Sequence, residues 1–197
     1  FTIFALTESG LCHQLLQKLA RHIHERTEII ARAFPGHLWR IYGPEVATEP
    51  YLPPRLFEEY VVRYTSPMID IIHQYGGLVR IHSHGRIRTV LDYMVQMGAD
   101  AIDPLEPPPQ GDVELDWVRQ KYGKKLVLFG NLEIADIENT PTEKFRAIVR
   151  KTLEQASSAP GRGFILMPSA APYGRQITYQ TLQNYQTMVD MAIHWKY

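Results

Sequence analysis

Short apolar runs alternate along this sequence with longer segments of helical periodicity. The apolar runs that predict strands are Thr2–Leu6, Leu38–Tyr42, Leu78–Ser83, Ala101–Leu105, Leu126–Gly130 and Phe164–Met167. Between them, apolar residues recur at the spacing of one helix face, in Leu11/Leu15/Leu19/Ile23, Phe57/Tyr60/Val61/Tyr64 and Val90/Leu91/Met94/Met97. The alternation predicts parallel strands joined by crossover helices, and therefore an α/β fold.

Proline and glycine mark the ends of several predicted elements. Pro53-Pro54 precedes a helix predicted over Leu56–Tyr75, and Pro67 inside that helix is expected to kink or divide it. No low-complexity linker interrupts the chain, so residues 1–197 are predicted to form a single domain. Six predicted strands are fewer than the eight of a full β/α barrel. The pattern therefore leaves either an open sheet or a TIM-type barrel that lacks its first strands.

Composition narrows the classes of function. The 21 basic and 21 acidic side chains cancel, so no overall field recruits nucleic acid or an anionic membrane. The single cysteine, Cys12, cannot form an internal disulfide or a multi-thiolate metal site, which fits a reducing compartment. No apolar run approaches the roughly 20 residues that cross a bilayer, and no signal-peptide pattern is present. The sequence predicts a cytoplasmic protein, and its first residue, Phe1, suggests a fragment of a longer chain.

Polar side chains follow most of the predicted strands. In β/α folds the carboxyl ends of the strands meet on one face, where the chemistry takes place. The residues in these positions are Glu45, His82, His84, Asp103, Glu106, Asn131, Glu133, Ser169, Tyr173 and Arg175. Together they predict one composite site for a small-molecule substrate.

The pair His82 and His84 is the strongest metal candidate. Residues i and i+2 of a strand share a face, so the two imidazoles can ligate one cation if a third group arrives from another strand. Glu106 or Glu45 is the predicted third ligand. The alternative is structural: each ring hydrogen-bonds a neighbouring carbonyl, or one ring donates a proton and no metal binds.

The candidate catalytic groups at the strand ends are Glu45, Glu106, Asn131 and Glu133. Glu106 precedes three prolines, which would fix its carboxylate, although a rigid surface loop explains the same pattern. Asn131 is expected to bind a substrate carbonyl or carboxylate while Glu133 faces the mouth of the barrel. Alternatively, Asn131 belongs to a turn and Glu133 lies near the N-terminus of the next helix, where a negative charge is favoured.

Arginine side chains beside the predicted loops suggest an anionic substrate. Arginine recognises carboxylates through two parallel hydrogen bonds, and a polycarboxylate is a conceivable ligand. Arg86, Tyr173 and Arg175 are the predicted substrate-binding residues.

Four segments carry a family resemblance. In chain order they are LPPRLFEEYVVRYTSPMIDIIHQYGG, IHSHGRIRTVLDYMVQMGADAID, KKLVLFGNLE and GRGFILMPSA. Through them the chain resembles the uroporphyrinogen decarboxylase superfamily, which also contains zinc-dependent, corrinoid-linked methyltransferases. The resemblance covers most of Leu38–Tyr197 and implies a β/α barrel of which this chain is the C-terminal part. Because the family includes dimers, it also implies a homodimer.

The methyltransferase branch carries His-x-Cys-Gly where this sequence has His82-Ser83-His84-Gly85. In that branch a later cysteine completes a zinc site that activates a thiol. Its position falls at about Ala170, which cannot coordinate metal, so Glu106 or Glu45 would have to replace it. This branch implies zinc and a corrinoid protein as partner.

The decarboxylase branch uses no metal or cofactor. The aspartate and the early arginine of this branch would lie upstream of this sequence. Its tyrosine after the first strand is not evident here, and the position of its late histidine falls at about Ala170. The sequence therefore lacks residues that the family pattern requires for either activity, and the resemblance implies a divergent branch.

The sequence leaves three hypotheses. The first is metal-assisted methyl transfer or demethylation, with His82, His84 and Glu106 as ligands. The second is cofactor-free decarboxylation of uroporphyrinogen or a related polycarboxylate. The third is an inactive binding or assembly module, which the alanine at position 170 favours and the concentration of His, Glu, Asn and Arg at the predicted strand ends opposes.

Overall fold

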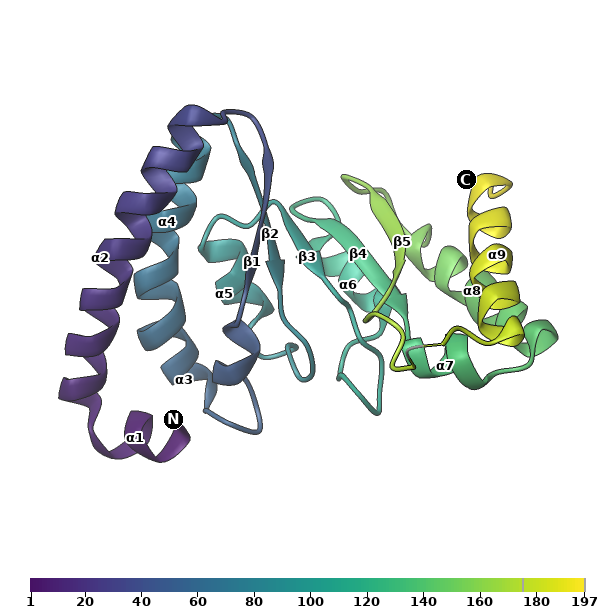
Figure 1. Ribbon diagram of the computed structural model, residues 1–197, viewed down its shortest axis with the longest axis horizontal. Helices are drawn as coiled ribbons and strands as arrows, with labels where there is room; N and C mark the ends of the chain where they lie inside the picture. Colours follow the sequence, from purple (N-terminus) through teal and green to yellow (C-terminus); the bar gives the residue numbers. More distant parts are fainter. Residues whose placement is uncertain (175, 197) are drawn as a thin grey trace. The chain divides into compact units, whose positions relative to one another are not determined.

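The computed structural model describes residues 1–174 and 176–196 (Figure 1). Five strands form one sheet in the order β1-β2-β3-β4-β5, and helices connect successive strands. This arrangement confirms the predicted α/β class. The chain divides into two compact units, Phe1–Ala101 and Ile102–Tyr197. Among the described residues, no helix is both long and apolar enough to span a membrane.

The first unit contains two parallel strands and the helices that cover them. Its elements are α1 (Thr2–Thr7), α2 (Ser9–Ala33), β1 (Leu38–Tyr42), η1 (Pro44–Ala47), α3 (Pro54–Phe57), η2 (Glu58–Val62), α4 (Arg63–Gln74), β2 (Leu78–His82) and α5 (Leu91–Gln96). Helix α2 packs along α4, and α4 packs against β2. Val79 and Ile81 of β2 are fully buried, so one face of this strand belongs to the hydrophobic core.

The predicted long helix is present and runs without interruption from Pro54 to Gln74, so Pro67 does not divide it. Helix α3 ends at Phe57, a π-helical turn covers Glu58–Val62, and α4 follows. Pro67 lies inside α4, where it has no N–H to donate to the carbonyl of Arg63. The Ser66 hydroxyl donates to the Val62 carbonyl at 2.8 Å. The irregularity of this helix is the π-helical turn, which ends at Val62, about one turn before Pro67.

The strand predicted over Thr2–Leu6 is wrong, because this segment forms helix α1. The run is short and rich in apolar residues, and periodicity alone does not distinguish a buried strand from a helix at that length. Tertiary contact decides the outcome: Ala5 is buried, and its carbonyl accepts a hydrogen bond from the Tyr60 hydroxyl at 2.9 Å. The other five predicted strands are present with small changes at their ends.

Helix α2 forms as predicted, but the apolar stripe that predicted it is not its buried face. The stripe residues are each about half exposed: Leu11 54%, Leu15 50%, Leu19 49% and Ile23 50%. The buried positions of α2 are Cys12, Thr27 and Ala31. Burial, and then the nearby charge of Glu59, raises the pKa of the Cys12 thiol, so this thiol is a poor nucleophile near neutral pH.

The second unit contains the remaining strands and a separate core. Its elements are β3 (Ala101–Asp103), α6 (Leu115–Tyr122), β4 (Val127–Leu132), α7 (Ile134–Asn139), α8 (Thr142–Ala156), β5 (Phe164–Pro168) and α9 (Tyr179–Ile193). Strands β4 and β5 are parallel, with Leu128 opposite Phe164. The core packs Leu132, Phe145 and Val149 between β4 and helix α8.

A histidine on α2 fixes the start of this helix to the π-helical turn. Nε2 of His13 lies 2.7 Å from Oε1 of Glu59, and the Ser9 hydroxyl donates to the same oxygen at 3.2 Å. The hydrogen bond with His13 is the main cause that lowers the pKa of Glu59 below its ordinary value. A carboxyl whose folded-state pKa is lowered stabilises the fold above its unfolded pKa, and this contribution disappears as the pH falls through the folded pKa.

We expect Glu59→Gln to lower the free energy of unfolding at pH 7 by about 0.5 to 1 kcal/mol, the usual range for a partly exposed pair. The Glu59 side chain is 34% exposed, so solvent screens the interaction. In acid the difference from the wild type should become smaller, because the contribution of the Glu59 carboxylate is lost as the pH falls through its lowered pKa. Urea unfolding at pH 7 and at about pH 3 measures this, with the exposed Glu154→Gln as control. An equal loss at both pH values would contradict the explanation.

Candidate active site

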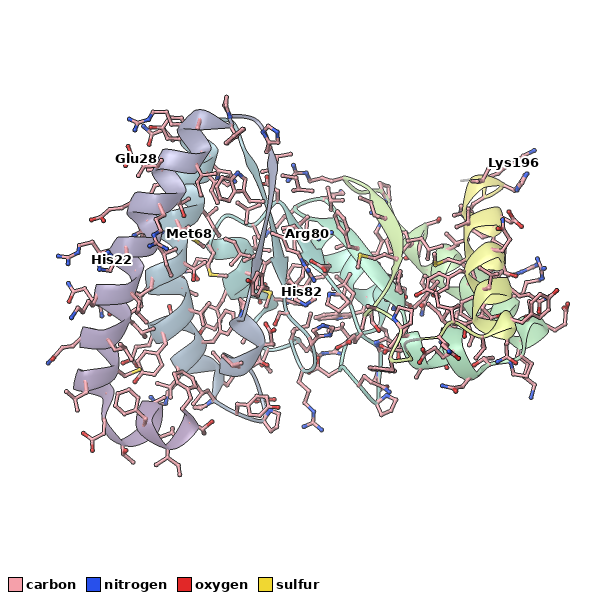
Figure 2. The ribbon with its side chains drawn as sticks, viewed as in Figure 1. His22, Glu28, Met68, Arg80, His82 and Lys196 are labelled. Carbon is pink, nitrogen blue, oxygen red and sulfur yellow. The ribbon has the colours of Figure 1, made fainter. Side chains whose placement is uncertain are left out.

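Strands β1 and β2 bring two arginines and a histidine to one face. The strands are parallel, and their register places Arg40 opposite Arg80 and Tyr42 opposite His82. Because side chains alternate along a strand, Arg40, Arg80 and His82 share one face, while buried Val79 and Ile81 lie on the other. Figure 2 labels Arg80 and His82, which follow one another on this face of β2.

Arg40 determines which nitrogen of His82 carries the proton. Nη2 of Arg40 lies 2.8 Å from Nδ1 of His82. A guanidinium only donates hydrogen bonds, so Nδ1 must accept, and the proton of the neutral ring lies on Nε2. The His82 residue is only 7% exposed. Its Nε2–H is therefore an oriented donor on a largely desolvated ring.

His84 lies directly against His82. The two ring centroids are 4.5 Å apart and the ring planes are perpendicular. Strand β2 ends at His82, so His84 belongs to the loop that follows, and Ser83 between them is fully buried. The two imidazoles are thus brought together, as the sequence predicts.

The Glu45 carboxylate is hydrogen-bonded within its own loop rather than to the histidines. Oε2 of Glu45 accepts a hydrogen bond from the backbone N–H of Gly43 at 2.9 Å. Gly43 has a φ of +110°, a backbone conformation that favours glycine. Among the described residues, Glu45 makes no hydrogen bond or ion pair with His82 or His84. Its carboxylate closes the turn after β1.

Arg86 follows the histidines on an exposed loop. Its backbone forms an isolated bridge with Glu49, which ties the loop after β2 to the loop before α3. The side chain is exposed. It is available to a ligand in solution.

The histidine pair does not fit a metal ion as it is arranged. A ring nitrogen needs a free lone pair to ligate a metal. In His82 the Nδ1 lone pair accepts from Arg40, and Nε2 carries the proton. A metal at His82 would therefore require Arg40 to give up its hydrogen bond. In the described part of the chain, no three His, Cys, Asp or Glu side chains gather as a metal site.

Three of the predicted polar residues of the second unit, Asn131, Glu133 and Ser169, are buried and hydrogen-bonded within it. Oδ1 of Asn131 accepts from the Thr152 hydroxyl of α8 at 3.2 Å. Glu133 is the N-cap residue of α7, and its Oε2 accepts from the Ser169 hydroxyl at 3.1 Å. Ser169 Oγ also accepts from the backbone N–H of Ile134 at 3.2 Å. These contacts join β4, α7 and the end of β5.

The remaining predicted residues of this unit differ in exposure. Glu106 is 6% exposed and Asp103 is fully buried, whereas Tyr173 is 76% exposed. The backbone N–H of Tyr173 donates to Oε1 of Glu138 at 3.0 Å, which anchors the loop after β5 to α7. Arg175, a predicted substrate-binding residue, lies outside the described residues.

Arg40 and Arg80 are the residues that our sequence reasoning missed. A short repeat in the sequence indicates these two arginines: LWRIY at Leu38–Tyr42 and LVRIH at Leu78–His82. In each copy an arginine precedes the last residue of the strand by two positions, and so shares its face. Only the register of the two strands shows that the copies lie side by side.

Comparisons with known proteins agree with this fold. None of the curated proteins compared matches the sequence. Among solved structures, the chain is similar to a sugar phosphate isomerase/epimerase from Parabacteroides distasonis, with 13% identity and a TM-score of 0.53. The match covers 92% of this chain and 65% of that chain, and it supports the TIM-type fold. The sequence model of the family described as Uroporphyrinogen decarboxylase (URO-D) matches residues 1–194, and the chain therefore belongs to that family.

Proposed function

We propose that this protein is a metal-free decarboxylase that acts on a polycarboxylate, with uroporphyrinogen as the first substrate to test. Membership of the family supports an enzyme of the decarboxylase or methyltransferase type. The hydrogen bond from Arg40 to His82, beside Arg80 on the same strand face, favours the decarboxylase. Arg40 and Arg80 offer cationic donors to substrate carboxylates, and His82 offers a neutral donor. The hydrogen bond also occupies Nδ1 of His82, the nitrogen that a metal would need.

The two arginines would bind substrate carboxylates that do not react. In the reaction the bond between the substrate carbon and its carboxylate breaks, and carbon dioxide leaves. The electron pair stays on the substrate carbon, which takes up one proton from solvent. An ion pair on the departing carboxylate would stabilise the ground state and slow this step. Guanidinium groups therefore accelerate the reaction by holding other carboxylates or by stabilising charge that develops on the remaining substrate.

His82 would act as a neutral hydrogen-bond donor. With Nδ1 accepting from Arg40, the ring presents Nε2–H. This donor can bind a substrate oxygen and hold the substrate in a fixed position relative to the two arginines. Arg40 is then a positioning residue for His82 as well as a carboxylate ligand.

Zinc-assisted methyl transfer is the second candidate. The contact between the rings of His82 and His84, with centroids 4.5 Å apart, favours it. Glu106 as third ligand, and a corrinoid protein as partner, belong to this candidate. It requires Arg40 to release Nδ1 of His82, and we therefore place it second.

The first test is carbon dioxide release from uroporphyrinogen by the purified full-length protein. We expect Arg40→Met to lower kcat/KM by about 100-fold, because it removes a preorganised cation and frees the His82 ring. Arg40→Lys should recover only part of this, since lysine lacks the planar fork. Arg32→Met, an exposed arginine on α2, is the matched control. Absence of carbon dioxide release, or full activity of Arg40→Met, would count against the proposal.

The second test separates the two candidates through His82. Glutamine offers an oxygen to Arg40 and an N–H to the substrate, so His82→Gln should keep kcat/KM within about tenfold of the wild type, whereas His82→Ala should lose about 100-fold. A chelator should leave the wild-type enzyme unchanged. If zinc is required, both substitutions and the chelator abolish activity, and zinc restores the chelated enzyme. Activity assays with elemental analysis of tag-free protein measure these outcomes.

A further inference from the structure

A groove of about 840 Å³ lies between helices α2 and α4 of the first unit. This volume is within the range of small-molecule sites, about 300 to 1,000 Å³. The groove is hollow because short side chains, Ala20 and Pro67, line it where the two helices face each other, and Ile71 adds an apolar surface. Its lining comes from the helices, whereas Arg40, Arg80 and His82 lie on the strands.

Three cations line the groove without carboxylate partners. Lys18 and Arg21 lie one turn apart on α2, and Arg63 is the first residue of α4. Within the described residues, none of the three takes part in an ion pair.

The carboxylates of the groove interact elsewhere. Glu25 lies 3.9 Å from His22, and Glu28 accepts from the Tyr75 hydroxyl at 3.4 Å. The lining therefore carries three cations and two carboxylates, and this excess of positive charge favours an anion from solution.

Tyr64, the aromatic residue of the groove, is held by one hydrogen bond at its hydroxyl and one at its backbone carbonyl. The Tyr64 hydroxyl lies 2.8 Å from Nδ1 of His13, and the Tyr64 carbonyl lies 2.9 Å from Nε2 of His24. The guanidinium carbon of Arg63 lies 5.7 Å from the centre of the Tyr64 ring. A wall that is already ordered costs little further entropy when a ligand stacks on it, and aromatic rings favour flat partners.

We propose that this groove binds a small organic anion with a flat apolar body and a carboxylate or phosphate group. The anionic group lies among Lys18, Arg21 and Arg63, and the apolar body lies against Tyr64 and Pro67. The proposal does not rest on the decarboxylase activity, because it uses none of the residues of the strand face.

Calorimetric titration of the full chain tests the proposal with benzoate, phenyl phosphate and inorganic phosphate. We expect at least one aromatic anion to bind with a Kd tighter than about 1 mM, and inorganic phosphate to bind at least about tenfold more weakly. The stronger of benzoate and phenyl phosphate identifies the preferred anionic group. Failure of both aromatic anions to bind with a Kd below about 1 mM would overturn the proposal.

Substitutions test whether the aromatic anion binds in this groove. Arg21→Met and Arg63→Met should each weaken it by about tenfold or more, and Ala20→Leu should weaken it without changing any charge, because leucine fills the groove. Arg26→Met, on the same helix but outside the groove, is the matched control and should change Kd less than about twofold. Circular dichroism melting verifies the fold of each variant. Equal weakening by Arg26→Met, or an unchanged Kd in Ala20→Leu, would contradict the location.

Discussion

The hydrogen bond from Arg40 to Nδ1 of His82 is the interaction on which the candidate site depends. It joins two neighbouring strands, and it assigns the ring proton to Nε2 because a guanidinium cannot accept. The same contact therefore has two consequences. It makes His82 an oriented neutral donor, and it removes the lone pair that a metal would use.

This contact follows from ordinary packing of the first unit. Val79 and Ile81 lie on the buried face of β2. Arg80 and His82, which alternate with them, therefore point away from the helices. Parallel pairing with β1 then places Arg40 beside Arg80 and within reach of His82. In the second unit, Asn131 and Glu133 instead bind Thr152 and Ser169. Asn131, Glu133 and Ser169 thus join strands to helices in the second unit, whereas His82 lies on a strand face that also carries two arginines.

Much of the fold could be predicted from the sequence, because apolar periodicity records which faces are buried. Five of the six predicted strands are present, and the exception, Thr2–Leu6, is a run too short for its period to separate helix from strand. The stripe of Leu11, Leu15, Leu19 and Ile23 predicted a helix correctly but not its buried face. Periodicity reports that a helix is amphipathic, and tertiary contacts decide which part of its surface is covered.

The candidate site was less predictable, for a different reason. The apolar run placed His82 correctly at a strand end, whereas His84 lies in the loop that follows and meets His82 through its ring. The partner of His82 lies 42 positions earlier in the chain, and its role depends on a register that no local pattern contains. Glu45 was predicted as a metal ligand, yet in the described residues its carboxylate bonds to the N–H of Gly43 two residues before it. A local hydrogen bond of this kind is not visible in the pattern of residues along the chain.

The most direct test of this account is the tautomer of His82, measured by ¹⁵N NMR of the histidine rings, with the His82→Gln protein identifying the signal. The account predicts a neutral ring with the proton on Nε2 in the wild type, and a mixture of tautomers in Arg40→Met. A proton on Nδ1 in the wild type, or an identical spectrum in Arg40→Met, would contradict it.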